Sequence, residues 1–559
     1  MRHFNAPDSL AQNNLFDAAV LDGTAWWATH LTPNALRHLQ EGWQGVFRRS
    51  VLALMPAEDL GQHFDPQLGR PTKELYSMAA LTLIMEFKNW TIDAAAEAYS
   101  YHNDLHYALN LPRDRQYLCP RSLDTYRKLV REDQLVGDIF TQVTARLIEE
   151  LNLSITKQRL DSTHLFSDMA VFGRTKLMAT AVKRFLVNLK RHSAASYNTL
   201  DAALRERYEV SQARLFGEAG SSAEGRTKAR QEVAQDMHDL IERCADDPAI
   251  NTRSSYLAMQ RIFEEHCEIK LGKVSVRAKS RDAQDRSSHT MQNPSDGGAG
   301  YDGHKGSGYQ VQLAQTSATS NPVQMITVCL PQSAGASDSA AVPQVIAAQQ
   351  AMAAVPDEMS ADTAYGSDAN VEYSAAHGID LISPVPGRRP KANQAATEQT
   401  ADQEAGPAVA NESASASASA SELSEPSKAE RIAQRREREQ SEEWRGKYRR
   451  RAGIESLNRG LDRVTGIKQL RVRGLVAVSH AVIGKACGWN ILQAARAKAK
   501  AARAERKVGK MGKVGKSGWQ KIGQAIQVSW QRLNTLARAC LLASTAGINA
   551  LMNPRPAVQ

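Results

Sequence analysis

Paired cysteines, long apolar runs and a secretion-type leader are all missing from this 559-residue sequence. None of its 6 cysteines forms a Cys-x-x-Cys pair, which argues against a zinc ribbon or a disulfide framework and fits a reducing cytoplasm. No apolar run approaches the roughly 18–20 residues that span a bilayer, and no basic segment followed by an apolar one opens the chain. We therefore expect no membrane partner, and we set aside the secreted and zinc-finger classes.

Acidic residues become scarce toward the C-terminus. Residues 431–559 contain 28 Lys and Arg against 7 Asp and Glu, a net charge of +21, whereas the preceding 430 residues carry −11. Such a density of cations is the usual footprint of nucleic-acid binding, because each Lys or Arg near a phosphate releases condensed counterions. The ordinary alternative is a solvated, self-repelling tail. The charge distribution favours a nucleic-acid partner.

Hydrophobic periodicity predicts an α/β core between helical flanks. Alternating patterns predict strands around Leu160, over 309–316 and over 325–330, and helical patterns predominate before and between them. The first helical region is either a helix-turn-helix-like DNA-binding module or simply an all-α domain. The expected organisation is a helical N-terminal domain (1–150), the first part of the core (151–173), a helical insertion (174–280), the rest of the core (281–385), a linker (386–430), a charged helix with the helix after it (431–495) and a basic C-terminal region (496–559).

The stretch 386–430 has a low-complexity composition. It contains the repeat Ser-Ala-Ser-Ala-Ser-Ala-Ser-Ala-Ser and few large aliphatic residues. Such a segment buries too little apolar area to offset its ordering entropy, so the composition predicts a flexible linker.

Three carboxylates stand out by their context. Asp161 follows a strand pattern, Asp362 lies where a strand pattern becomes a turn, and Glu455 lies on a basic helical segment. Phosphodiester chemistry with two divalent ions needs oxygen ligands of this kind, because the ions must clamp both the attacking and the leaving oxygen. The alternative is that two are ordinary turn residues and the third is a surface glutamate.

Strong helix formers predict a helix that begins around Arg431 and continues through Leu461, and its part around Glu455 carries further polar residues at regular spacing. Tyr448, Arg451, Glu455, Arg459 and Asp462 fall on one face of a helix with a 3.6-residue period. The cations one turn away from Glu455 are either ordinary ion-pair partners or arginine forks that bind phosphate oxygens beside a metal ligand.

Five segments together resemble the DDE transposases of bacterial insertion sequences. The segments occur in the expected order, and the resemblance spans roughly residues 70–495. They are Leu160-Asp-Ser-Thr-His, Gly303-His-Lys-Gly-Ser-Gly-Tyr, Ala361-Asp-Thr-Ala-Tyr-Gly-Ser, Tyr448-Arg-Arg-Arg-Ala-Gly-Ile-Glu and Gln469-Leu-Arg-Val-Arg-Gly. The resemblance implies an RNase H-like α/β catalytic core with an all-α N-terminal domain, a helical insertion and a basic helical C-terminal region.

The resemblance also implies roles for individual residues. Asp161, Asp362 and Glu455 would be the catalytic carboxylates that bind two Mg²⁺ ions, with Mn²⁺ able to substitute. Tyr448 and Arg451 would contact the DNA of the element end, and the glycine-rich loop that contains Lys305 would contact DNA as well.

One position departs from the family pattern. The family usually has Lys seven residues after the glutamate, where this chain has Asp462. Arg459 and Arg463 lie close enough in sequence to supply the missing cation, because both have long side chains with planar guanidinium groups. The competing hypothesis is that Asp462 marks an inactive copy.

Other candidates for the metal site are weaker. His164 is more simply a strand residue, and His304 is more simply part of the loop. Asp168 is a rival for Asp161, but it lies beyond the strand pattern.

The resulting hypothesis is a bacterial, nucleoid-associated transposase that cleaves element ends and transfers the freed strand to target DNA. Its partners would be double-stranded DNA and a second copy of itself in the DNA complex. The alternatives are an RNase H-like nuclease without strand transfer and a decayed, non-catalytic DNA-binding copy.

The charge asymmetry generates a first prediction. Deleting the region after residue 495 should weaken DNA binding across sequences and flatten its salt dependence, because these cations would contact phosphates rather than base edges. Binding measured at several salt concentrations checks this, and an unchanged salt slope would assign the region another role.

Overall fold

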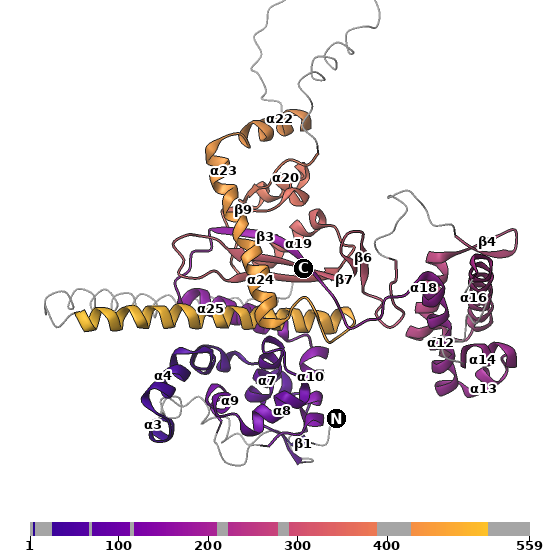
Figure 1. Ribbon diagram of the computed structural model, residues 1–559, viewed down its shortest axis with the longest axis horizontal. Coiled ribbons are helices and arrows are strands. Elements are labelled where there is room, and N and C mark those ends of the chain that lie inside the picture. Colours follow the sequence, from indigo (N-terminus) through magenta and orange to yellow (C-terminus); the bar gives the residue numbers. More distant parts are fainter. Residues whose placement is uncertain are drawn as a thin grey trace, which may run out of the picture. The chain divides into compact units, whose positions relative to one another are not determined.

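The computed structural model describes residues 4–5, 25–65, 70–111, 117–209, 222–277, 290–387 and 426–511 (Figure 1). The chain divides into two units, Met1–Ala497 and Lys498–Gln559. Of the second unit, only residues 498–511 are described, and they continue the helix α25 (Leu475–Met511). Most of the linker expected over 386–430 and most of the basic region expected over 496–559 lie outside the described residues.

The described N-terminal residues are almost entirely helical. Helix α7 is apolar over nearly its whole length and is buried on all sides, and the Glu74 carboxylate caps it by accepting from the Tyr76 and Ser77 amides. Thr91 caps α8 in the same way, by accepting from the Ala94 amide. The helices are α3 (Ala25–His30), α4 (Pro33–Glu41), α5 (Trp43–Val46), α6 (Ala57–Gly61), α7 (Leu75–Phe87), α8 (Ile92–Tyr101), α9 (Asn103–Ala108), α10 (Pro120–Glu132) and α11 (Val136–Glu150). A π turn (Phe47–Val51), a 3₁₀ turn (Leu52–Leu54) and the short strands β1 (Phe4–Asn5) and β2 (Arg70–Pro71), which pair in parallel, complete this part.

A six-stranded mixed sheet forms the centre of the described chain. Strands β3, β7 and β8 are antiparallel neighbours, whereas β3 pairs in parallel with β9 and β9 in parallel with β10. The short strand β6 forms a hairpin with the start of β7. The bounds are β3 (Lys157–Leu165), β6 (Gly300–Asp302), β7 (Gly306–Thr316), β8 (Ile326–Ser333), β9 (Glu358–Ser360) and β10 (Asp380–Ile382).

Helices pack on both faces of this sheet. On one face Leu160 packs with Val342 and Ile346 of α19 (Asp338–Ala351), and α20 (Asp368–Ala376) follows a 3₁₀ turn (Thr363–Tyr365). Side chains alternate along a strand, so Asp161 points to the opposite face, where its register partner Leu313 belongs to the large core. The alternation thus directs Asp161 toward the helices that follow the linker.

A second hydrophobic core belongs to residues inserted between β3 and β6. Phe185, Met237 and Met259 lie at its centre, and all three are fully buried. Its helices are α12 (Arg174–His192), α13 (Ala194–Asn198), α14 (Ala202–Glu209), α16 (Ala223–Cys244), α17 (Pro248–Asn251) and α18 (Ser254–His266). The hairpin of β4 (Cys267–Lys270) and β5 (Lys273–Val276) follows them, in a stretch that was expected to belong to the helical insertion.

The charged segment after the linker is not one helix. The sequence predicted a continuous helix from Arg431 through Leu461, but the chain forms α22 (Lys428–Arg438), α23 (Glu442–Tyr448), a 3₁₀ turn (Arg449–Ala452) and α24 (Gly453–Thr465). The break has a local cause, because the Ser441 hydroxyl accepts from the Trp444 amide and starts a new helix. Helix α24 then ends at Gly466, whose φ of 62° suits glycine.

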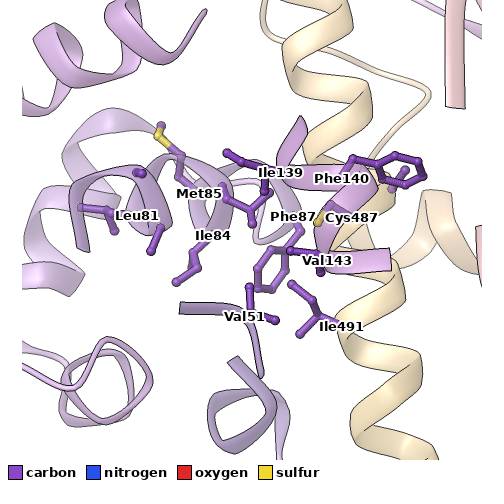
Figure 2. Close-up of a cluster of buried hydrophobic side chains, with 14 of the residues drawn as sticks. Val51, Leu81, Ile84, Met85, Phe87, Ile139, Phe140, Val143, Cys487 and Ile491 are labelled. Carbon is purple, nitrogen blue, oxygen red and sulfur yellow. The ribbon is translucent and has the colours of Figure 1, made fainter. Parts of the chain in front are cut away.

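The first 23 residues of helix α25 pack against both the N-terminal helices and the sheet. Figure 2 shows Cys487 and Ile491 among side chains from α7 and α11, including Phe87 and Val143. A Cβ at Gly488 would collide with the Phe87 ring, so glycine permits this close approach. On the sheet side, the Asn490 amide bonds the Ile326 backbone at the start of β8.

By length and composition alone, helix α25 is long and apolar enough over Leu475–Arg506 to cross a membrane. Most of its apolar window, 67%, is buried inside the protein, however, and the window contains the buried polar residues Lys485 and Asn490. Both side chains bond other parts of the fold, so the apolar surface of α25 is that of a core helix.

Buried charges connect α25 to α7, α10 and α24. The Lys485 ammonium donates to the carbonyl oxygens of Glu86 (2.9 Å) and Thr465 (2.7 Å). The Glu86 carboxylate pairs with Arg127 at 2.8 Å and lies 3.8 Å from the His480 ring. Burial lowers the pKa of Lys485 to about 8 and that of His480 to about 4, although Glu86 opposes both shifts.

The buried His480 generates a prediction about acid stability. The imidazole takes up a proton near pH 6.5 in the unfolded chain but only near pH 4 in the folded one, so stability is lost as the pH falls between these values. Relative to His480→Asn, the native protein should lose about 2 kcal/mol of unfolding free energy between pH 7.5 and pH 5. Urea denaturation of both proteins at the two pH values tests this. Parallel pH profiles for the two proteins would contradict it.

Candidate active site

Asp161 lies on β3, and Asp362 lies beside it, just beyond the end of the parallel neighbour β9. Arg159 of β3 is opposite Ser360 of β9, and extending this register by two residues brings Asp161 level with Asp362. The Asp161 side chain is 15% exposed and that of Asp362 is 34% exposed. The fold therefore brings together two of the three carboxylates expected from the sequence.

The environment of Asp161 makes its negative charge costly. Burial is the main cause and raises the pKa of Asp161 to about 6; the Arg451 guanidinium opposes this shift, and the Asp362 carboxylate adds to it. A carboxylate in such surroundings favours a nearby cation.

Arg451 supplies positive charge to both carboxylates. Its Nη2 atom lies 3.7 Å from Asp161 Oδ1 and 3.6 Å from Asp362 Oδ2. Its Nε is buried and, within the described residues, has no hydrogen-bond partner. The guanidinium thus lies between two carboxylates without making a close bidentate bond to either.

Asn458 is a contact that the sequence analysis did not identify. Its Nδ2 donates to Asp161 Oδ2 at 3.2 Å, and its buried Oδ1 has no hydrogen-bond partner among the described residues. The helical period was the available signal, because Arg451, Glu455 and Asn458 are separated by four and three residues and share one helix face.

Glu455 does not join the two aspartates in this structure. Its side chain is exposed and makes no hydrogen bond or ion pair with another described residue. The described part of the chain holds no group of three His, Cys, Asp or Glu side chains spaced to bind one metal ion. Glu455 nonetheless lies on α24 between Arg451, which is in the preceding 3₁₀ turn, and Asn458, and both of these residues contact Asp161.

Tyr448 lies at the end of α23, close to the aspartate pair. Its ring stacks on Trp444 with centroids 5.0 Å apart and an interplanar angle of 15°. Burial raises the pKa of Tyr448, Arg451 lowers it, and Asp362 and Asp161 raise it further. The tyrosine, the arginine and both aspartates therefore share one electrostatic environment.

The other expected DNA-binding residues are on the surface. Arg459 and Arg463 are exposed one turn apart on α24, and Lys305 is exposed in the turn between β6 and β7. The Asp302 carboxylate shapes that turn by accepting from the His304 and Lys305 amides at 2.7 and 2.8 Å.

Asp462 has a structural role at the end of α24. Its Oδ1 accepts from the Lys468 amide at 3.1 Å, and its carbonyl accepts from the Gly466 amide at 2.7 Å. A lysine side chain cannot accept the first of these bonds. The departure from the family pattern therefore coincides with a bond that shapes the turn after the helix.

The weaker candidates lie apart from the aspartate pair. His164 is a buried strand residue whose ring contacts Phe166 edge-on at 4.7 Å, and burial lowers its pKa. His304 is exposed in the β6–β7 turn. Asp168 is exposed beyond the end of β3, and its amide donates to the Val472 carbonyl.

Arg159 attaches the start of α24 to the sheet. Its guanidinium donates to Gln315 Oε1 on β7 and, from Nη1, to the Arg450 carbonyl at 3.2 Å. The space for this guanidinium exists because residue 453 is glycine, since a Cβ there would overlap Arg159 Nη1. This contact fixes the level at which α24 crosses Asp161.

Much of the positive charge in residues 431–451 is already paired within the chain. Glu358 of β9 pairs with Lys447 at 3.1 Å and also with Arg450, and Asp380 of β10 pairs with Arg438 at 2.7 Å. Asp368 of α20 pairs with Arg431 at 2.7 Å. These cations hold α22, α23 and the turn after α23 to β9, β10 and α20, so the net charge of this segment overstates the number of its cations that are free to bind other partners.

Comparison with known protein families gives a match over the second part of the sheet and the helices that follow it. Residues 279–491 match the family described as the transposase DDE domain. No curated protein and no solved structure matches the chain. The matched residues include Asp362, Arg451 and Glu455, whereas Asp161 precedes them. This part of the chain is therefore similar to a transposase DDE domain, in agreement with the resemblance found in the sequence motifs.

The close approach at Gly453 generates a third prediction. Gly453→Ala should displace the Arg159 guanidinium and lower the unfolding free energy by about 1–3 kcal/mol, because two buried bonding groups lose their partner. Gly446→Ala is the matched control, since a Cβ on this residue of α23 meets nothing within 4 Å. Urea denaturation of both variants is the measurement. Equal stability of the two would show that Arg159 does not anchor the helix.

Proposed function

We propose that this chain is an insertion-sequence transposase that hydrolyses a phosphodiester at the element ends and joins the freed 3′-hydroxyl to target DNA. The observation that carries the proposal is that Asp161 and Asp362 lie at the same level beneath the helix that bears Glu455. The match to the transposase DDE domain supports it independently.

The strand order supports an RNase H-like core, as the family resemblance implies. The order β8-β7-β3-β9-β10 joins three antiparallel strands to two that continue in parallel. Asp161 lies on the central strand β3, and Asp362 lies just beyond the end of the adjacent strand β9. Neighbouring parallel strands are a simple way to hold two carboxylates at one level.

The aspartate pair fits a hard divalent cation. Both side chains present carboxylate oxygens toward one guanidinium, and the buried Asn458 Oδ1 beside them has no partner in the described part of the chain. Oxygen ligands of this kind suit Mg²⁺ and Mn²⁺. Two such ions, when bound, would stabilise charge on the attacking and leaving oxygens and activate water.

Five residues of the chain have distinct roles in this proposal. Asp161 and Asp362 are the first two carboxylates, and Glu455 is the third. Because Glu455 is exposed, its side chain can change rotamer toward the pair without losing packing. Arg451 offsets the charge of the aspartate pair in the free protein and, with Tyr448, is directed to the DNA end in the complex.

Exposed cations bind the DNA near the scissile phosphate in this proposal. Arg459 and Arg463 extend from α24 beyond Glu455, and Lys305 extends from the β6–β7 turn. The two arginines replace the cation that the family usually carries at the position of Asp462, and their guanidinium forks suit phosphate oxygens. Assembly as a homodimer on the DNA remains a prediction from the family resemblance.

Removing a single carboxylate provides the test of the catalytic assignment. Asp161→Asn, Asp362→Asn and Glu455→Gln should each reduce Mg²⁺-dependent nicking and joining of element ends by more than about 100-fold, because each removes a charged metal ligand. DNA binding, measured by mobility shift, should persist in all three variants. A gel assay of nicked and joined products measures the activity.

Two matched substitutions complete the experiment. Glu437→Gln changes an exposed glutamate of α22 in the same way and should leave nicking unchanged, and so should Asp168→Asn. If Asp161→Asn still nicks DNA substantially and Asp168→Asn does not, Asp168 rather than Asp161 is the first catalytic carboxylate. Nicking without joined product would instead indicate a nuclease.

A further inference from the structure

Asn458 is bonded at one end of its amide and unsatisfied at the other. Its Nδ2 donates to Asp161 Oδ2 at 3.2 Å, whereas its Oδ1 is buried without a hydrogen-bond partner among the described residues. Buried polar atoms in native proteins are nearly always paired, so an unpaired oxygen beside a catalytic carboxylate calls for a functional explanation.

The place of Asn458 on α24 is not explained by packing. Ile454, Leu457 and Leu461 form the buried stripe of the helix, and Asn458 lies at the edge of that stripe, facing Asp161. A bond to Asp161 requires only a donor such as Nδ2, so it does not explain the buried acceptor Oδ1 on the same side chain. The asparagine thus places a neutral oxygen near the carboxylate, where another acid would add repulsion.

The two ends of the amide are nearly equal in size. Rotation by 180° about the Cβ–Cγ bond exchanges Nδ2 and Oδ1 with little change in packing. In the present orientation the N–H group stabilises the Asp161 carboxylate. After rotation, Oδ1 would face the carboxylate oxygen, which is favourable only with a cation between them.

We propose that Asn458 supplies an additional oxygen ligand to the divalent cation held by Asp161. This inference rests on the proposed function, because it assigns a fourth residue to the same metal site. Asparagine carbonyl oxygens are ordinary ligands of hard cations. Asn458 serves both states of the site, as a donor to the free carboxylate and as an oxygen ligand when the cation is bound.

A change of ligand softness tests whether Asn458 touches the ion. Replacing the amide with a thiol by Asn458→Cys should raise the preference of the site for Cd²⁺ over Mn²⁺ by about tenfold or more, because thiolates favour soft cations. Ser456→Cys is the matched control, since residue 456 is exposed on α24 two residues earlier. Both ions are titrated calorimetrically into the full-length protein without DNA, so the readout does not depend on activity.

The outcomes separate this inference from the proposed function. A Cd²⁺ preference in Asn458→Cys that is absent from Ser456→Cys supports the additional ligand. If Mn²⁺ binding requires Asp161 but both cysteine variants have the same ion preference, Asn458 is not a ligand, and the proposed function stands. If Asp161→Asn binds Mn²⁺ like the native protein, or if the native protein binds none, both proposals fail.

Two further variants test the assignment if Asn458→Cys does not fold. Asn458→Asp preserves the size and an oxygen atom at each end, and it should bind Mn²⁺ at least as tightly as the native protein. Asn458→Leu removes both polar atoms and should weaken Mn²⁺ binding by about 10–100-fold. Weaker binding by Asn458→Asp, or native affinity in Asn458→Leu, would overturn the assignment.

Discussion

Burial of helix α25 is the constraint on which the rest of the structure depends. Its apolar surface is covered by α7 and α11 on one side and by the sheet on the other, and Gly488 allows contact with the Phe87 ring. The Lys485 ammonium, bonded to the ends of α7 and α24, fixes how these three helices meet. Because α24 packs its Gly460 on Trp489 of α25, the position of α24 follows from that of α25.

Charge has two distinct uses in the segment that follows the linker. Lys447 and Arg450 pair with Glu358 and tie this segment to the sheet edge, whereas Arg459 and Arg463 remain exposed on α24. Arg451 belongs to neither group, because it lies between the two aspartates. The same residue type therefore attaches helices to the sheet, remains exposed on the surface of α24, and offsets the charge of the two aspartates, and only the partners of each arginine distinguish these uses.

Local patterns were sufficient for most of the central strands and for the resemblance to DDE transposases. Alternation predicted the strands near Leu160 and over 309–316, because side chains on neighbouring strand positions face different environments. The hairpin of β4 and β5 was missed because its exposed tip lacks such a contrast. The continuous helix expected from Arg431 was wrong, since a single capping hydroxyl at Ser441 overrides the strong helix propensity around it.

The sequence by itself determined the residue types of the candidate site, the order of its motifs and the resemblance of residues 279–491 to a transposase DDE domain. Only the tertiary structure decided that Asp161 is level with Asp362, that Arg451 lies between them, that Asn458 contacts Asp161 and that Glu455 is turned toward solvent. The physical reason is that strand register and helix docking depend on contacts between residues far apart in the chain. The bond from Arg159 to the Arg450 carbonyl is one such contact, and no local periodicity contains it.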